Sequence, residues 1–317
     1  MLKIKIIGAG IAGAMASGYF SSSKPVVFEA SENKKAKLNK HKAVMRIRDP
    51  RVGMILGTDM KEIDVYKQCL YRDKLYWESD IRMRNLYSIK INGDIEERSI
   101  TNLGKVKRYL LTDFELSDVN YESKVVGFGE DGRTIQIEKN GELEETEYDY
   151  CISTIPVFEL LSILKIKTEN SFPSKDIHIV RTKSLLKSEV HQTIYIPEEK
   201  YDCYRATLEG EEMIFESANK FPKEEEIEEL SSYFGIKGLN PENTEKHTQK
   251  MGKIIPTEDD FRRTVIVDLT ERYNIFSLGR FAVWKQIKTD DLIQDLDLIR
   301  KMIGISDAKR IYKSRIV

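Results

Sequence analysis

The sequence is poor in cysteine and has no long apolar run. Its 317 residues contain three cysteines, Cys69, Cys151 and Cys203, which form no CxxC pair and no even-numbered set. Such spacing argues against a zinc site and a disulfide framework, so we predict no bound metal and a reducing, cytoplasmic setting. No stretch reaches the roughly 18 apolar residues that cross a bilayer, and Gly8 interrupts the apolar start of the chain. We therefore expect neither a membrane span nor a signal peptide.

A surplus of charge of either sign is missing as well. The formal net charge is −1, with 32% charged and 40% hydrophobic residues. This balance argues against a strongly basic nucleic-acid binder, while a nucleotide or a modified base stays open as a substrate. The length predicts about two domains and a sizeable core. The partner that we expect is a small-molecule substrate, and the composition does not set the oligomeric state.

The first thirty residues predict one β-α-β unit. A strand over Leu2–Ile7 is followed by a helix of small apolar residues over Ile11–Phe20, and a short buried strand over Pro25–Glu29 closes the unit. Between the first strand and the helix lies Gly8-Ala-Gly-Ile-Ala-Gly13, which fits G-x-G-x-x-G. In this position the motif predicts a dinucleotide-binding turn.

Each glycine of the motif has its own task. Gly8 permits a tight turn, Gly10 lets the backbone approach a pyrophosphate, and Gly13 lets the helix pack closely on the sheet. The first helical N–H groups then face the phosphates. A carboxylate at Glu29 accepts hydrogen bonds from ribose hydroxyls and repels a 2′-phosphate. A close-packed turn without a ligand is the alternative, but the order of strand, helix and acid favours binding. The predicted contacts here are Gly8, Gly10, Ile11, Ala12, Gly13, Glu29 and Ala30.

Three further strands, at Tyr121–Phe128, Thr134–Lys139 and Tyr148–Ser153, predict a β-meander because Gly-containing turns separate them. Pro156 ends it, and a helix is expected over Val157–Leu164. Elsewhere the pattern predicts an exposed helix near 30–40, a strand over Leu86–Ile91 with a hairpin at Asn92-Gly93, a helix over 112–120, strands at Gln192–Ile196 and Met213–Ser217, a helix over Lys223–Phe234, a strand at Tyr273–Arg280 and a helix over Asp290–Ile303.

Two segments resemble a known family. Tyr148-Asp-Tyr-Cys-Ile-Ser-Thr-Ile-Pro156 is similar to the strand that returns to the nucleotide in the flavin amine oxidase and UDP-galactopyranose mutase superfamily. Asn274-Ile-Phe-Ser-Leu-Gly-Arg280, then Trp284 and Asp290-Asp291-Leu-Ile293, resembles the last flavin motif of that superfamily. The resemblance extends over residues 1–50, 110–160 and 270–305.

The resemblance implies FAD as the cofactor and an α/β fold. It implies a Rossmann-like FAD-binding domain, with a parallel sheet and a β-meander, built from residues 1–50, 110–160 and 270–317. An α+β substrate domain is then inserted as residues 51–109 and 161–269, with the active site in the cleft between the two domains. The further cofactor contacts that it implies are Val125, with adenine beside the Val125–Val126 backbone, Thr154, Gly279, Arg280, Asp290, Asp291, Leu292 and Ile293.

These C-terminal residues also have a physical logic. Thr289 or Asp290 caps a helix whose N-terminus points at the flavin pyrimidine, where negative charge gathers on reduction. Gly279 lets the backbone approach the ribityl chain, and Arg280 pairs with a pyrophosphate or a ring oxygen. Taken singly, Arg280 reads as a surface arginine and Asp290-Asp291 as a plain helix cap. Their order relative to the N-terminal motif favours FAD.

The sequence also departs from the family. The Gly-Gly pair expected some ten residues after the ribose acid is missing from residues 33–42, and so is the histidine-rich loop of the mutases. Arg46 or Arg48 is expected to take over phosphate or flavin contacts. Without these features the resemblance gives little support for transferring the mutase chemistry itself.

Three residues are candidates for the chemistry. His41 is a candidate base or orienting group, with a surface histidine as the alternative. The resemblance implies that Lys253 approaches flavin N5 through a water molecule; the alternative is a solvated lysine. Trp284 is a candidate for the pocket wall at the flavin edge; the alternative is a core tryptophan. Arg262-Arg263 is either an anion site or a solvated face.

The function that follows is an FAD-dependent oxidoreductase that transfers hydride from an amine-like or other small substrate to flavin N5. The first alternative is a flavin-dependent mutase or lyase without net oxidation. A non-catalytic nucleotide-sensing module and an NAD-dependent enzyme with a single nucleotide domain are the others.

Overall fold

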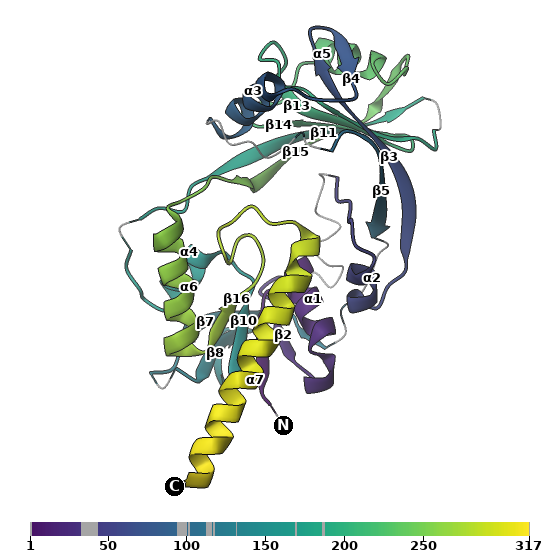
Figure 1. The fold of residues 1–317 in the computed structure, drawn as a ribbon. Coiled ribbons are helices and arrows are strands. Elements are labelled where there is room, and N and C mark those ends of the chain that lie inside the picture. The colour runs from purple at the N-terminus through teal and green to yellow at the C-terminus, as the bar shows by residue number, and fades with distance from the viewer. Residues whose placement is uncertain are drawn as a thin grey trace.

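The protein is described by a computed structural model over residues 2–32, 44–93, 100, 102–111, 116, 118–130, 132–168, 170–185 and 188–316. Two units lie one above the other in Figure 1. The lower unit is a parallel sheet with helices and a meander on its faces, and the upper unit is a large sheet that carries two helices. The predicted α/β fold, a Rossmann-like sheet with a second strand-rich unit, is confirmed.

The lower sheet is assembled from distant parts of the chain. Its five strands are all parallel and lie in the order β16-β10-β1-β2-β6. Because they are parallel, their carboxyl ends meet at one edge, which is the edge where such sheets bind ligands. The strands are β1 (Ile4–Ile7), β2 (Val26–Phe28), β6 (Val119–Asn120), β10 (Tyr150–Ser153) and β16 (Ile275–Ser277).

Both faces of the lower sheet are buried, as its unbroken apolar strands require. Three helices pack on one face: α1 (Ile11–Tyr19), α2 (Arg51–Leu56) and the N-terminal half of α7 (Leu292–Ile316). The other face is covered by the meander β7 (Ser123–Phe128), β8 (Thr134–Lys139) and β9 (Glu142–Glu147), together with α4 (Val157–Ile163) and α6 (Asp259–Tyr273). Short 3₁₀ turns lie at Ser21–Ser23 and Thr289–Asp291. Within the described residues, no helix is both long and apolar enough to cross a bilayer.

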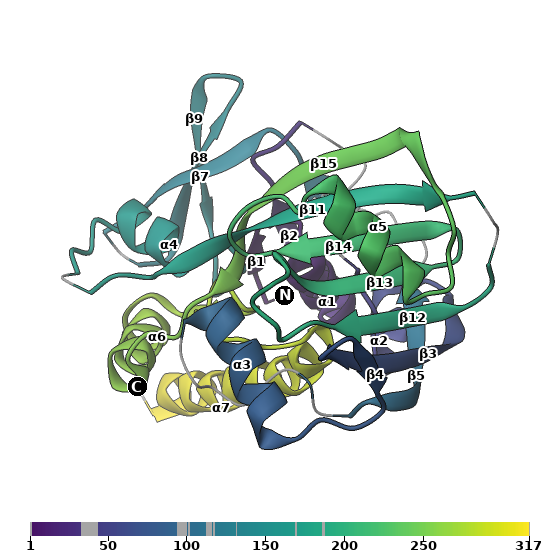
Figure 2. The ribbon, with the colours of Figure 1, turned by 90° about the horizontal axis from the view of Figure 1, so that it is seen from above.

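The upper sheet has eight strands in the order β15-β11-β14-β13-β12-β3-β4, with β5 paired to β3. Helix α5 (Glu224–Ser232) lies across its outer face, as Figure 2 shows from above. The buried side chains of α3 (Ile81–Asn92) pack against residues of the opposite, inner face. The strands are β3 (Met60–Tyr71), β4 (Lys74–Tyr76), β5 (Gly104–Leu111), β11 (Ser174–Ser184), β12 (His191–Tyr195), β13 (Cys203–Glu209), β14 (Glu212–Ser217) and β15 (Leu239–Ile254).

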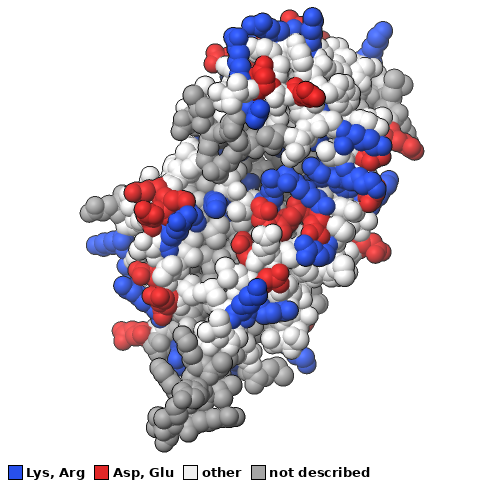
Figure 3. All heavy atoms as spheres, viewed as in Figure 1, with Lys and Arg blue, Asp and Glu red and all other residues white. Residues whose placement is uncertain are grey.

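The division into a discontinuous FAD-binding domain and an inserted substrate domain stays a prediction. Two helices differ from that division, because α2 and α6 lie in sequence ranges given to the substrate domain but pack on the parallel sheet. In Figure 3, basic and acidic side chains lie side by side at mid-height on the visible face. Ion pairs such as Lys105–Asp64 and Lys107–Glu62 join β5 to β3.

One predicted hairpin is wrong. The segment Leu86–Ile91 belongs to α3, which begins after Asp80, whose carboxylate accepts a hydrogen bond from the Met83 backbone N–H at 2.7 Å. Gly93 ends the helix in the left-handed conformation, with φ at 79°. A glycine after asparagine suits a helix end as well as a hairpin, and here the helical spacing of buried residues decides between them.

The predicted meander is wrong in its third strand. The third strand of the observed meander is β9, whose side chains are almost all exposed. The segment predicted for that place, Tyr148–Ser153, instead contains β10, which joins the parallel sheet between β1 and β16. Strand β9 is rich in glutamate, which hides its strand character from a hydropathy pattern. The helix expected near 30–40 and most of the one expected over 112–120 lie outside the described residues, and residues 119–120 belong to β6.

Candidate cofactor and active site

The turn after β1 has the geometry that its glycines predict. Gly8 has φ at 94°, and a Cβ on it would lie 2.6 Å from Oγ1 of Thr154. That hydroxyl donates to the Ile7 carbonyl at 2.8 Å, so the end of β10 is fastened to the end of β1. Gly13 is equally confined, because a Cβ there would lie 1.9 Å from the Gly8 carbonyl oxygen.

Gly10 differs from its two neighbours in the motif. A Cβ on Gly10 would meet no atom of the described residues within 4 Å, and its φ of −71° suits any residue. It precedes α1, and no side chain caps that helix. The open space over Gly10 and the uncapped N–H groups of α1 together form a cradle for a phosphate.

Glu29 closes this turn from the end of β2. Its side chain is 4% exposed, and its carboxylate accepts from the Ala9 N–H at 2.8 Å and the Ser31 N–H at 3.1 Å. The Ser123 N–H donates to the Glu29 carbonyl at 3.0 Å, so the start of β7 runs beside the acid. Val125 follows on β7 with its side chain in the core, which leaves its backbone for any contact with a base.

The C-terminal motif reaches the same edge. Gly279 follows β16 with φ at 95°, and a Cβ on it would lie 2.9 Å from Cβ of Ala12 in the first turn of α1. The Leu278 N–H donates to the Ser153 carbonyl at 2.9 Å, which extends the pairing of β16 with β10. The structure therefore brings three distant stretches of sequence to one sheet edge.

The residues at the start of α7 mostly serve the fold. The Asp290 carboxylate accepts from the backbone N–H groups of Arg48 at 2.8 Å and Asp49 at 2.9 Å, and Asp291 accepts from the Lys288 N–H at 2.7 Å. Leu292 and Ile293 are buried in the core under α7.

Two further predicted contacts lie near the glycine turn. Ile11 is partly exposed and Ala30 is exposed at this edge, so both remain available to a ligand.

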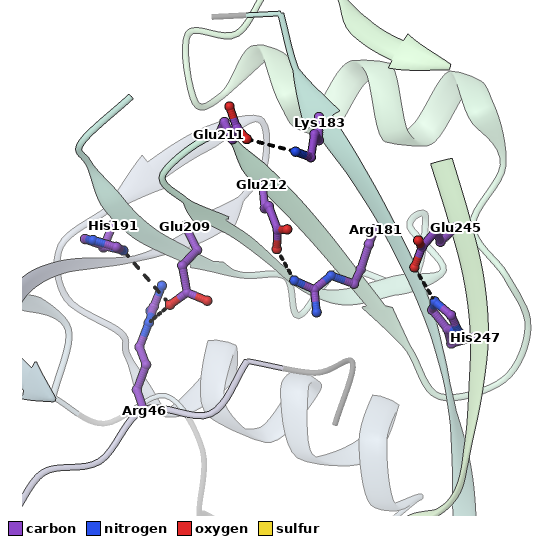
Figure 4. Close-up of polar contacts among 9 residues, drawn as sticks. All are labelled: Arg46, Arg181, Lys183, His191, Glu209, Glu211, Glu212, Glu245 and His247. Atoms are coloured by element: carbon purple, nitrogen blue, oxygen red, sulfur yellow. Dashed lines mark hydrogen bonds and ion pairs between the residues drawn. The ribbon is translucent and has the colours of Figure 1, made fainter. Parts of the chain in front are cut away.

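Arg46 does not reach the phosphate cradle. Its guanidinium points to the upper sheet, where Nη1 donates to Oγ1 of Thr193 at 2.7 Å and Nε lies 3.2 Å from Oε1 of Glu209. Figure 4 shows this side chain directed at the sheet. The sequence argument assumed that a cation near the ribose acid serves the cofactor, whereas β12 and β13 supply the partners.

The inner face of the upper sheet carries polar residues that the sequence argument missed. Ala206 and Leu208 of β13 lie in the core under α5, so the alternate residues Arg205, Thr207 and Glu209 face the lower unit. Thr207 is opposite Thr193 of β12, and both are buried. The sequence signal that could have found this face is the alternation of polar and apolar residues along β13.

An ion pair on this face is almost enclosed. Glu216 of β14 is 1% exposed and receives two hydrogen bonds from Arg205, the one from Nη2 at 2.6 Å. Tyr204 donates to the same carboxylate at 3.3 Å. Such a pair is retained in a core only when its groups satisfy one another, as they do here.

Lys253 joins the inner face to the cofactor edge. It lies near the end of β15, and its ammonium is 5.0 Å from the ring centroid of Tyr204. Burial, and then the cation of Arg205, lower its pKa from 10.5 to about 8, and Arg280 adds to this from the lower unit while Glu216 opposes it. Burial also lowers the pKa of Arg280, which stacks on Phe281 at 4.6 Å. No carboxylate of the described residues pairs with either cation.

The remaining candidate residues do not contribute to a site among the described residues. Trp284 is 1% exposed and packs edge-on against Phe158 and Phe172, so it is a core residue and does not line a pocket. The paired arginines are also structural, since Arg262 contacts Asp259 and the Val283 carbonyl, and Arg263 contacts Asp259. His41 lies outside the described residues. Among those that are described, no three His, Cys, Asp or Glu side chains gather as metal ligands.

Comparisons with known proteins agree with this architecture. The sequence matches no protein-family model and no curated protein. The fold is similar to that of reduced UDP-galactopyranose mutase, with a TM-score of 0.67 and 14% identity over 96% of this chain and 94% of that one. A CLA-producing fatty acid isomerase from P. acnes gives 0.63 and 12% over 95% and 98%. A flavoprotein/dehydrogenase from Cytophaga hutchinsonii gives 0.51 and 10% over 95% and 79%. At these identities the likeness shows the fold, which is the one that the sequence resemblance predicts.

Proposed function

We propose that this chain binds FAD at the carboxyl edge of the parallel sheet and is an oxidoreductase for a small organic molecule. One observation carries the proposal: the glycine turn, Glu29 and Gly279 meet at one edge although they lie far apart in the sequence. The similar structures include a flavoprotein/dehydrogenase and a UDP-galactopyranose mutase, which belongs to the superfamily that the sequence resembles, and both support FAD over a nicotinamide cofactor.

The residues at this edge fit the two halves of the cofactor. In this proposal the pyrophosphate binds in the space over Gly10, at the N-terminus of α1. The Glu29 carboxylate, which already accepts a hydrogen bond from the Ala9 N–H, also accepts hydrogen bonds from the ribose hydroxyls. The turn at Gly279, packed against Ala12, is placed for the ribityl chain, with Arg280 beside it. Bound FAD supplies hydride acceptance at its N5 atom.

The protein's own contribution is to shape and charge the space between the units. Lys253 lies where the inner face of the upper sheet approaches Arg280. Because its pKa is about 8, a fraction of Lys253 is neutral at neutral pH and is able to take a proton from a substrate. The side chains of Tyr204 and Glu216 near it are buried. We propose Lys253 as the catalytic residue.

The cofactor assignment is tested on purified protein. We expect a yellow protein with a band near ~450 nm, or one that turns yellow on soaking with FAD. Glu29→Ala removes the ribose acceptor and is expected to weaken FAD binding about tenfold to a hundredfold. The matched control is Glu32→Ala, which removes an exposed carboxylate three residues away. A colourless protein that stays colourless with excess FAD ends the proposal.

A redox-neutral reaction is the second candidate, because a mutase and an isomerase are among the similar structures. The two are separated under anaerobic conditions. If candidate substrates bleach the oxidised flavin in a one-to-one ratio, the protein is an oxidoreductase, which then returns its electrons to oxygen or another acceptor. If turnover requires prior reduction with dithionite and yields no net oxidation, it is a mutase or lyase.

A further inference from the structure

Arg46 carries a buried donor that no described residue satisfies. Its side chain is 9% exposed, so the guanidinium has left water almost completely. Two of its nitrogens bind Thr193 and Glu209, but Nη2 is buried and has no hydrogen-bond partner among the described residues. A buried N–H of a cation without an acceptor is destabilising, so its presence needs an explanation.

A second unsatisfied group lies beside it. Nδ1 of His191, opposite Glu209 in the strand register, is buried without a hydrogen bond, and it is 4.0 Å from Oε1 of Glu209. That separation is too long for a hydrogen bond. In Figure 4 the dashed lines from the imidazole and from the guanidinium lead to the same Glu209 carboxylate. Both side chains therefore lie next to Glu209, and each has one nitrogen without a hydrogen bond to the described residues, Nη2 of Arg46 and Nδ1 of His191.

The charge of this cluster points to the sign of its ligand. Glu209 supplies one negative charge, while Arg46 supplies a positive charge and Lys61 lies close enough to depress protonation of His191. At the far end of the same face, Lys253 and Arg280 add two cations without carboxylate partners. An amine substrate would be repelled by both ends, whereas an anion would be attracted.

The position of the cluster also indicates the length of the ligand. Glu209 is four residues beyond Arg205 on β13, which is about 13 Å along a strand. The buried Thr193–Thr207 pair lies between them on the same face. A molecule that touches Lys253 at one end and Arg46 at the other is thus elongated, with a middle that lies along the threonines.

We propose that Arg46 and His191 form a subsite for an anionic group, a carboxylate or a phosphate monoester, on an elongated substrate that lies along the inner face of the upper sheet. The inference rests on the proposed function in one respect, since it takes the space between the units as the active site. The guanidinium Nη2 donates to the anion, and His191 donates through Nδ1 when that tautomer or the imidazolium is present.

The test uses the FAD-loaded protein and calorimetric titration with four probes of one chain length: hexanoate, hexyl phosphate, hexylamine and hexanol. Flavin absorbance is recorded in parallel, so loss of the cofactor is distinguished from loss of the subsite. We expect hexanoate or hexyl phosphate to bind, and whichever binds more tightly identifies the anion. Hexylamine and hexanol are expected to bind at least tenfold more weakly, because hexylamine is a cation and hexanol carries no negative charge to pair with the guanidinium.

Two arginines on the same face give a matched pair of variants. Arg46→Met is expected to weaken anion binding about tenfold to a hundredfold, while Arg181→Met, which removes a cation already paired with Glu212, changes it less than about threefold. If Arg46→Met does not fold, Thr193→Val releases the guanidinium from its anchor and serves instead. Equal effects of the two arginine variants, binding of hexylamine as tight as that of the anions, or no binding of either anion to the wild-type protein would each overturn the proposal.

Discussion

The two sides of the space between the units are built on different principles. The lower side is made by backbone: three glycines, helix N–H groups and strand ends that meet at one edge. The upper side is made by side chains on a sheet face: a buried ion pair, two threonines and Lys253, which pairs with no carboxylate of the described residues. A backbone site recognises what many ligands share, such as a pyrophosphate, whereas a side-chain site is changed by single substitutions. Under the proposed function, cofactor binding and substrate choice are therefore encoded by separate parts of this chain.

The largest effect is expected where the backbone has no room. Gly13→Ala places a Cβ 1.9 Å from the Gly8 carbonyl oxygen, so the helix must move from the sheet. We expect a loss of about 3 kcal/mol or more in the free energy of unfolding, together with loss of FAD. Thermal melts and flavin absorbance measure the two.

Gly10→Ala is the matched control for that change. Its Cβ meets nothing within 4 Å, so stability is expected to stay within about 0.5 kcal/mol while FAD binding falls. If Gly10→Ala unfolds the protein as Gly13→Ala does, the two glycines do not have separate tasks and the comparison fails on its lower side.

The next largest effect is expected at the ion pair of the upper side. Glu216→Leu leaves the Arg205 cation on the inner face without its carboxylate, which costs about 3–5 kcal/mol in the free energy of unfolding. The double variant Arg205→Met with Glu216→Leu removes both charges and is expected to recover most of that loss. Urea denaturation of the three proteins measures the difference, and a double variant as unstable as the single one would contradict a pairing role.

Lys253 is expected to make the free energy of unfolding depend on pH. Its pKa is about 8 when folded and 10.5 ordinarily, so between these values the unfolded chain holds more protons. Its contribution to stability therefore rises as the pH rises through about 8 toward 10.5. Lys253→Met is expected to remove this rise while lowering turnover about a hundredfold or more, since a general base is lost. Denaturation midpoints at pH 7 and 10 measure the first effect, and a Met variant that retains the wild-type slope excludes Lys253 as its source.

The smallest effect is expected at His191. Burial, and then the cations of Arg46 and Lys61, lower its pKa, while Glu209 opposes them. An anion bound beside the ring raises that pKa, so anion affinity is expected to increase as the pH falls and the imidazole is protonated. His191→Gln is expected to flatten this dependence and change the affinity at pH 8 less than about threefold. Titrations at pH 5.5 and 8 provide the measurement.

The sequence predicts the lower side well because its signals are local. Gly8, Gly10, Gly13 and Glu29 lie within 22 consecutive residues, and their spacing reflects one turn and one strand end. Gly279 was found through a resemblance to a motif, which its contact with Ala12 explains. Trp284 was misplaced because an aromatic residue near a glycine turn reads equally as core or as pocket wall.

The upper side was beyond the sequence for a physical reason. Arg46 finds Glu209 across 163 residues, and Arg205 finds Glu216 through strand pairing that no local pattern specifies. The register of β12, β13 and β14 decides which side chains face the lower unit, and a shift of one residue would turn all of them outward. The alternation within β13 marks its polar face, but only the packing of α5 tells which face that is.

The late position of β16 and α7 has a consequence for the order in which the protein is made. Strand β16 begins at Ile275, and the half of α7 that covers α1 ends near Ile303, so the nucleotide cradle that begins at Gly8 is complete only after these residues have left the ribosome. During that interval only the part of α1 that α7 covers stays exposed, since β1, β10 and α2 pack on the rest, and exposed apolar surface favours aggregation of a nascent chain. Cofactor capture at the completed edge then follows the synthesis of α7.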